Sequence, residues 1–186
     1  MADTILWRSM DEPGHEAVRL ERGADGWILR GTAVLLHEGR ACRLDYTVRT
    51  DEAWRSTGAR VQGWMGDEPV DVTIAVGADG HWTLNGAEVP EVAGCVDVDL
   101  NFSPSTNLLP IRRLGLDVGG EGEVHAAWLR FPSFRLERLQ QTYRRTGELS
   151  YRYESADGAF MRDLDVNAAG LVTRYPGLWE AEPVGG

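Results

Sequence analysis

The stretch CRLDYTVRT, Cys42 to Thr50, alternates apolar and polar residues without a break. Its apolar set falls at every second position: Cys42, Leu44, Tyr46 and Val48. Its polar set fills the positions between: Arg43, Asp45, Thr47 and Arg49. A period of two places each set on one face of an extended chain, with the apolar face toward a core and the polar face toward solvent. The stretch therefore predicts a half-buried antiparallel strand.

Similar runs extend on both sides of this strand. Before it lies GWILRGTAVLL, and the short HEG between the two runs predicts a hairpin in which Gly39 takes positive φ. After it we expect strands in ARVQGWM, VDVTIAV, HWTLN, VHAAWLRFP, QQTYRRTG, LSYRYES, AFMRDLDV and LVTRYPGLW. The clusters GADG, NG, ADG and NAAG separate several of these runs and are typical of tight turns. The chain thus predicts a mainly antiparallel meander.

The number of expected strands indicates the fold class. A flat open sheet of this size would leave edges unpaired and one apolar face uncovered, so the sheet has to curl. We expect one all-β domain over residues 1–186, a curved sheet that forms a roll or half-open barrel with one or two short helices. DEAWRS is one candidate helical turn, and SPSTNLLP is another, with Ser103 as its N-cap.

Charge and composition exclude several classes of protein. All nineteen basic residues are arginine, twenty-nine residues are acidic, and the net charge is −10, which argues against nucleic acid or an anionic membrane surface as partner. No apolar run reaches the length of a transmembrane helix. The first ten residues lack the apolar segment of a signal peptide, so we expect a cytoplasmic protein.

The sequence holds no recognisable metal, cofactor or catalytic motif. Cys42 and Cys95 are too few for a zinc site, and the histidines form no metal-binding pattern. We expect His37 and His81 to lie at turns, in solvent. The spacing of Asp97, Asp99 and Asn101 resembles the start of a calcium loop without its glycine or closing glutamate, and two carboxylates on one strand are too common to indicate a glycosidase. We therefore expect no metal, no cofactor and no catalytic residue.

The stretch DVDLNFSPSTNLLPIRRL, Asp97 to Leu114, gathers the polar groups of a candidate ligand site. Carboxylates accept hydrogen bonds from sugar hydroxyls, amides donate and accept, and guanidinium groups bind anions. The candidate polar residues are Asp97, Asp99, Asn101, Thr106, Asn107, Arg112 and Arg113. The alternative is structural: one aspartate pairs with one arginine, while Ser103, Thr106 and Asn107 satisfy an irregular backbone. Arg112 and Arg113, if extended after Pro110, point to opposite sides, so only one should face the aspartates.

Aromatic residues supply a large apolar volume on or beside the expected strands. They are Trp27, Trp54, Trp64, Trp82, Trp128, Trp179, Tyr46, Tyr143, Tyr151 and Tyr153. Such residues either fill the core or line a cavity in the concave face of a curled sheet. We expect Trp54 and Trp128 to be lining residues.

SPSTNLLPIRRL, followed by AAWLRFPSF, YRYES and GLVTRYPGLW, resembles the bacterial "putative glycolipid-binding" family over most of the chain. The first run carries the most specific part of the resemblance, at Ser103, Pro104, Thr106, Asn107, Leu109, Pro110, Ile111, Arg112, Arg113 and Leu114. The resemblance implies a spiral β-roll similar to a half-open barrel, a fold likened to periplasmic carriers of lipoproteins and glycolipids. It implies no catalytic residues.

Together these observations favour non-catalytic binding of an amphipathic small molecule, lipid-like or glycolipid-like, in the concave face of the sheet. Two alternatives remain open. One is an enzyme that acts on a small hydroxylated substrate at an unrecognised site, which strongly shifted buried carboxylates in a deep pocket would favour. The other is a β-scaffold for protein–protein interaction, which an exposed apolar patch over a shallow groove would favour.

Overall fold

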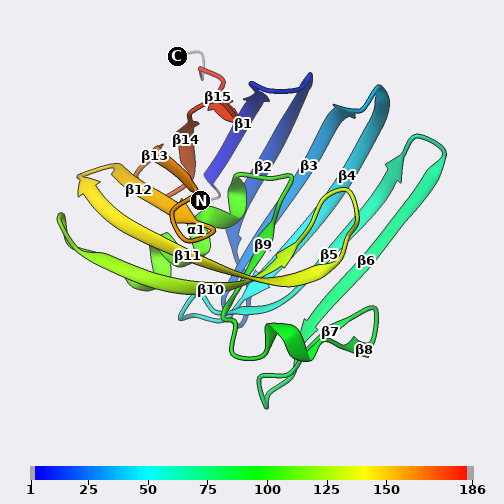
Figure 1. Ribbon diagram of the computed structural model, residues 1–186, viewed down its shortest axis with the longest axis horizontal. Coiled ribbons are helices and arrows are strands. Elements are labelled where there is room, and N and C mark those ends of the chain that lie inside the picture. The colour runs from blue at the N-terminus through cyan, green and yellow to red at the C-terminus, as the bar shows by residue number, and fades with distance from the viewer. Residues whose placement is uncertain (1–2, 184–186) are drawn as a thin grey trace.

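The computed structural model describes residues 3–183 and shows one curled, 15-stranded sheet (Figure 1). The first eight strands are β1 (Asp3–Ser9), β2 (Gly14–Arg22), β3 (Trp27–His37), β4 (Arg40–Thr50), β5 (Ser56–Met65), β6 (Glu68–Val76), β7 (Trp82–Leu84) and β8 (Ala87–Glu88). The others are β9 (Asp97–Leu100), β10 (Glu121–Leu129), β11 (Leu136–Gly147), β12 (Ser150–Ser155), β13 (Phe160–Val166), β14 (Val172–Tyr175) and β15 (Trp179–Ala181). The helical elements are η1 (Pro90–Val92), η2 (Ser105–Asn107) and α1 (Leu108–Leu114). The all-β fold with little helix is as predicted.

The strand order makes the sheet a spiral. It runs β8-β7-β6-β5-β4-β3-β2-β1-β15-β14-β13-β12-β11-β10-β9, and β1 beside β15 joins the two halves of the chain. Every pairing is antiparallel except that of β9 with β10. The β9 end then curls back toward β5, where the Ser56 amide donates to the Val96 carbonyl at 3.0 Å and the Val98 amide donates to Ser56 Oγ at 2.9 Å. The sheet is thus a spiral roll that does not close.

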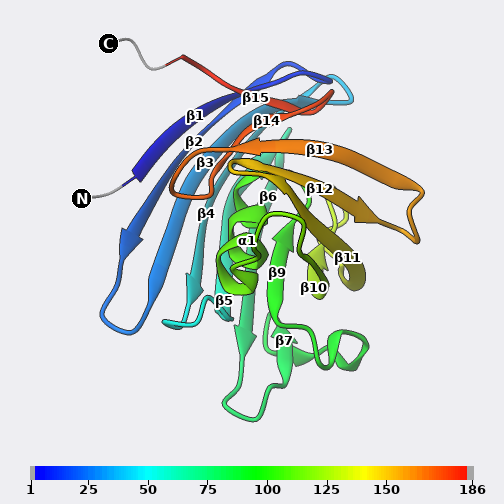
Figure 2. The same cartoon turned by 90° about the vertical axis from the view of Figure 1, so that its left-hand side faces the viewer.

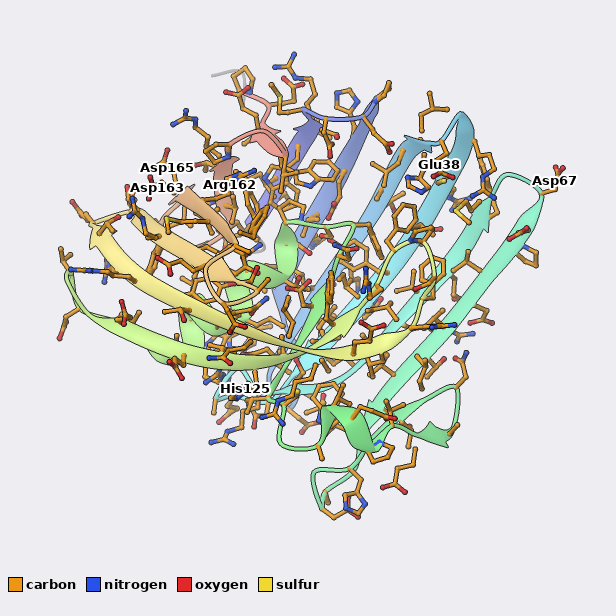
Figure 3. All side chains as sticks on the ribbon, in the orientation of Figure 1. Glu38, Asp67, His125, Arg162, Asp163 and Asp165 are labelled. Atoms are coloured by element: carbon orange, nitrogen blue, oxygen red, sulfur yellow. The ribbon has the colours of Figure 1, made fainter. Side chains whose placement is uncertain are left out.

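The strand β4 has the burial that its alternating sequence predicts. In β4, Cys42, Leu44 and Val48 are fully buried and Arg43 is exposed. The β3–β4 hairpin turns through Glu38 and Gly39, with φ of 49° and 76°, and Figure 3 shows Glu38 at its tip. Alternation and turn chemistry therefore decide this part of the fold.

The helix α1 lies inside the curl, between β3–β6 and β10–β13 (Figures 1 and 2). Leu108, Leu109 and Ile111 are buried there, and Gly115 ends the helix in the left-handed region at φ 54°. Pro110 is tolerated because it lies in the first turn, where its missing N–H costs no intrahelical bond. The expectation of an extended segment after Pro110 is therefore wrong.

Two further expectations about strands need correction. LVTRYPGLW forms two strands, β14 and β15, because Pro176 and Gly177 make a turn in which Gly177 has φ 77°. The sequence pattern also missed β1 and β2, which make the seam of the roll. There the Trp7 indole N–H donates to the Val172 carbonyl at 2.6 Å and ties β1 to β14.

The described residues can also be searched for membrane-spanning helices, metal-ligating clusters and disulfides. Within residues 3–183, no helix is long and apolar enough to cross a membrane. The same residues contain no group of three or more metal-ligating side chains suited to a metal ion. Cys42 and Cys95 are free, buried thiols, and burial raises the pKa of Cys95 to about 11.

Candidate functional site

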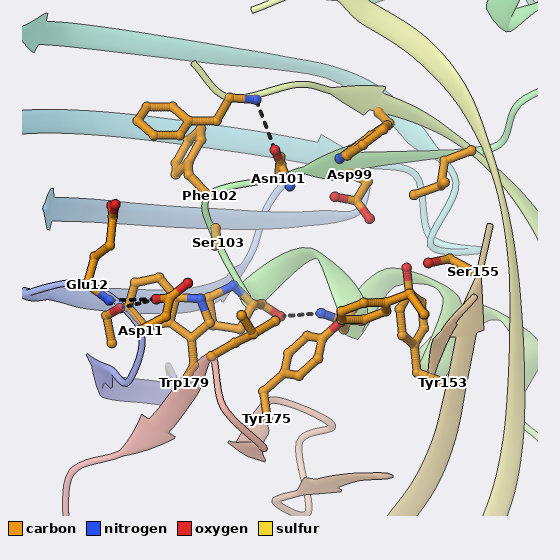
Figure 4. Close-up of a pocket in the computed structure, with 18 of the residues that line it drawn as sticks. Asp11, Glu12, Asp99, Asn101, Phe102, Ser103, Tyr153, Ser155, Tyr175 and Trp179 are labelled. Atoms are coloured by element: carbon orange, nitrogen blue, oxygen red, sulfur yellow. Dashed lines mark hydrogen bonds between the residues drawn. The ribbon is translucent and has the colours of Figure 1, made fainter. Parts of the chain in front are cut away.

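A cavity of about 560 Å³ lies inside the roll, between β1 and β3 on one side and β10–β13 on the other (Figure 4). Its walls are mainly aromatic and aliphatic: Leu35, Phe102, Pro104, Trp128, Phe131, Leu139, Ala156, Phe160, Tyr175, Leu178 and Trp179. Its polar lining consists of Ser9, Asp11, Glu12, His37, Asp99, Asn101, Ser103, Asn107, Tyr153 and Ser155. Both the volume and this mixture are typical of small-molecule sites.

One side of the cavity is organised around the half-buried carboxylate of Asp99 on β9. Gln141 on β11 donates through Nε2 to Asp99 Oδ2 at 2.6 Å and to the Tyr153 hydroxyl at 3.1 Å. Burial raises the pKa of Asp99 to about 6, against the opposing effect of the Gln141 hydrogen bond. Figure 4 shows Asp99, Tyr153 and Ser155 together on this side. The group offers a carboxylate oxygen and hydroxyls to a ligand.

Behind Ser103 lies a second buried carboxylate, that of Glu16 on β2. The hydroxyls of Tyr46 and Ser103 donate to its Oε1, the latter at 2.6 Å, and the Tyr46 hydroxyl oxygen also lies within hydrogen-bond distance of Ser105 Oγ, at 2.7 Å. Glu16 is fully buried, and its Oε2 has no hydrogen-bond partner among residues 3–183. Burial raises the pKa of Glu16 to about 8, so the carboxyl carries a proton at neutral pH. Sequence reasoning missed Glu16 because nothing marks it as an inward-facing residue.

The opposite side of the cavity holds Asp11 and Glu12 (Figure 4), and His37 lines the cavity beside Glu12. His37 Nδ1 lies 3.3 Å from Glu12 Oε2, and its ring packs edge-on against Phe131 at 4.7 Å between centroids. The expectation that His37 is solvated is therefore wrong, because the last residue of β3 turns its ring under Phe131. His81 is largely exposed, as predicted.

Two asparagines of the predicted site line the cavity, and both also support the backbone. Asn107 Nδ2 donates to the Pro104 carbonyl at 3.0 Å, and its Oδ1 accepts from the Tyr143 hydroxyl at 2.8 Å. Asn101 Oδ1 accepts from the Phe131 amide at 3.1 Å. Asp99, Asn101, Asn107 and Trp128 are thus the predicted residues that the fold brings together around the cavity.

The other predicted residues lie away from the cavity lining. Arg113 makes two hydrogen bonds to Asp97, whose side chain is almost fully buried, and burial raises the pKa of Asp97 against the effect of that arginine. Only one arginine faces the aspartates, as predicted, but the reason is helical geometry: side chains at successive helix positions point about 100° apart. Thr106 Oγ1 accepts from the Leu100 amide at 3.2 Å.

Arg112 and Trp54 form a separate cluster. The Arg112 guanidinium lies 5.2 Å from the Trp54 ring centre, and Trp54 stacks on Trp27 at 4.7 Å. Trp54 is buried there at a φ of 64°. Among residues 3–183, no arginine therefore lines the cavity.

The fold and this site can be compared with known proteins. The family model described as "putative glycolipid-binding" matches residues 4–181. A search of curated proteins finds no significant match. The crystal structure of a DUF1089 family protein from Pseudomonas aeruginosa superposes with a TM-score of 0.82 at 33% identity and covers 94% of both chains. The spiral roll, its enclosed helix and the family match over nearly the whole chain lead to one conclusion: the protein belongs to the putative glycolipid-binding family.

Proposed function

We propose that the protein binds an amphipathic, lipid-like small molecule in the cavity, without catalysing a reaction. The observation that carries this proposal is the cavity's mixed lining, an aromatic and aliphatic wall with carboxylate, amide and hydroxyl groups at its ends. Apolar walls favour hydrocarbon, while the polar groups orient a head group. The family description agrees with a ligand of this kind.

In this proposal Trp128, Phe160 and Trp179 contact the apolar part of the ligand, and Asp99 and Asn107 contact its polar part. Asp97, Arg113 and Thr106 hold the strand and helix that carry those polar groups. Arg112 and Trp54 take no part in binding.

A chain-length series tests the proposal. Alkyl glucosides of increasing length should quench or shift tryptophan fluorescence saturably, and each added methylene should tighten binding about fourfold, from roughly 0.8 kcal/mol of apolar burial. The rise should stop when the cavity is full. If each non-hydrogen atom of the ligand takes about 30 Å³, as a water molecule does, the cavity of about 560 Å³ holds roughly nineteen such atoms. Free glucose serves as the control and should bind weakly. Absence of saturable binding by any member would refute the proposal.

A second candidate is an enzyme that acts on a small hydroxylated substrate. The observation that favours it is the pair of raised carboxyl pKa values, about 8 at Glu16 and about 6 at Asp99. Such shifts are frequent at catalytic sites, although burial in a structural role also produces them. Turnover of nitrophenyl glycosides or esters that is lost in Asp99→Asn and retained in a surface variant would support this candidate over simple binding.

A further inference from the structure

The charged groups of the cavity lining determine which head groups it can accept. Its lining includes three carboxylates, Asp11, Glu12 and Asp99, and no arginine among the described residues. A phosphate, sulfate or carboxylate head would meet these three carboxylates, with the His37 imidazole already beside Glu12, and like charges in a partly desolvated space repel strongly. The cavity therefore disfavours anionic amphiphiles.

Asp97 and Asp99 on β9 differ in the groups that compensate their charges. Both side chains lie on one strand, two residues apart, but Asp97 is paired with Arg113 while Asp99 accepts a hydrogen bond only from the neutral Gln141. Asp99 Oδ1 has no hydrogen-bond partner within residues 3–183, and the side chain lines the cavity. A shielded carboxylate without a cation is costly unless something else compensates its charge.

Two arginines near the cavity do not supply that compensation. Arg130 lies over the Trp128 ring at 4.6 Å and donates to Glu137 at 3.2 Å. Arg162 lies over the Phe160 ring at 4.5 Å and donates to the Pro176 and Met161 carbonyls. Their guanidinium groups are thus committed elsewhere, while the lining keeps aromatic rings beside Asp99, with Tyr153 linked to it through Gln141.

We propose that Asp99 receives a cationic ammonium group of the ligand, so that the cavity selects an amphiphile with an amine head. An ammonium donates up to three hydrogen bonds, which suit Asp99 Oδ1 and the neighbouring hydroxyls of Tyr153 and Ser155. Aromatic rings around it add cation–π attraction. This inference rests on the proposed binding function and deepens it by naming the head group. The charged or titratable groups near Asp99 are Asp97 with its partner Arg113, Tyr143, Tyr153 and Tyr175.

The test compares three probes with the same chain: dodecylammonium, dodecyl glucoside and dodecanoate, each titrated at physiological salt below its critical micelle concentration. The expected order of affinity is ammonium, then glucoside, then carboxylate, with a preference of about tenfold for ammonium over glucoside, because hydrogen bonds to a charged group are stronger than neutral ones. This comparison uses the wild-type protein, so it does not depend on how any variant folds.

The variant Asp99→Asn then locates the source of the preference. The ratio of the ammonium and glucoside affinities should fall to about one in Asp99→Asn and stay at its wild-type value in Asp163→Asn, because Asp163 lies at the periphery of β13 and pairs with Arg152 (Figure 3). If the Asp99→Asn ratio does not change, or glucoside or dodecanoate binds as tightly as ammonium, the assignment is wrong. If no probe binds saturably, the proposed function itself fails.

Discussion

Replacement of Glu16 by glutamine should stabilise the protein at alkaline pH and leave its stability in acid almost unchanged. Glu16 is fully buried, and its Oε1 accepts hydrogen bonds from Tyr46 and Ser103. Glutamine keeps an acceptor oxygen at this position and carries no charge. Its amide NH2 group would take the place of Oε2, which has no hydrogen-bond partner in residues 3–183. The amide group and the protonated carboxyl oxygen are thus equally unpartnered at this position. Glutamine therefore mimics the protonated glutamic acid.

The sign of the pH effect follows from the two pKa values of Glu16, about 8 in the folded protein and 4.5 as the reference for the unfolded chain. Between these values the folded state holds a proton that the unfolded state has released, so the stability of the wild type falls as pH rises. At about 1.4 kcal/mol for each pH unit, the loss by pH 8 is on the order of 4 kcal/mol. The glutamine variant has no such loss.

The measurement is urea unfolding followed by tryptophan fluorescence, at intervals from pH 4 to pH 8.5. The free energies of unfolding should agree near pH 4, below the unfolded pKa of 4.5, and diverge steadily above it, with Glu16→Gln the more stable protein. Glu68→Gln, at an exposed position at the start of β6, is the matched control and should follow the wild type. A constant difference in the free energy of unfolding between wild type and Glu16→Gln at all pH values would refute the reasoning, because it would mean that the pKa of Glu16 is the same in the folded and unfolded states.

Two other substitutions test packing around the same interior. Arg113→Ala leaves the buried Asp97 carboxylate without its cation and should cost on the order of 3 kcal/mol in urea unfolding, whereas Arg112→Ala removes an exposed guanidinium and should cost less than about 1 kcal/mol. Equal losses would contradict this division. Gly31→Ala places a Cβ into the Tyr46 ring, and such overpacking costs about 1–3 kcal/mol, so the Tm should drop. An unchanged Tm would show that the ring moves freely.

The sequence pattern missed β1 and β2, and in β2 a single inward-facing residue explains why. In β2 the inward residues are Glu16, Val18 and Leu20, and the glutamate at the first of them breaks the apolar alternation. Burial of Glu16 depends on hydroxyls from β4 and from the segment after β9, which no local pattern contains. The same residue therefore concealed the strand and produced the buried carboxyl. Turn chemistry was more reliable, because Gly39 determines its hairpin locally.

The candidate site shows the same limit at Asp97 and Asp99. Strand periodicity predicts that the two carboxylates lie on one face, but it cannot tell which one a cation neutralises, since Arg113 comes from α1 and Gln141 from β11. One helical step decides the outcome: Arg113 reaches Asp97, while Arg112, about 100° away around the helix, rests on Trp54. Because both nearby arginines are thus used in the fold, the second carboxylate is left to the cavity. The pairing that stabilises the roll at Asp97 is therefore also what leaves Asp99 available to a ligand.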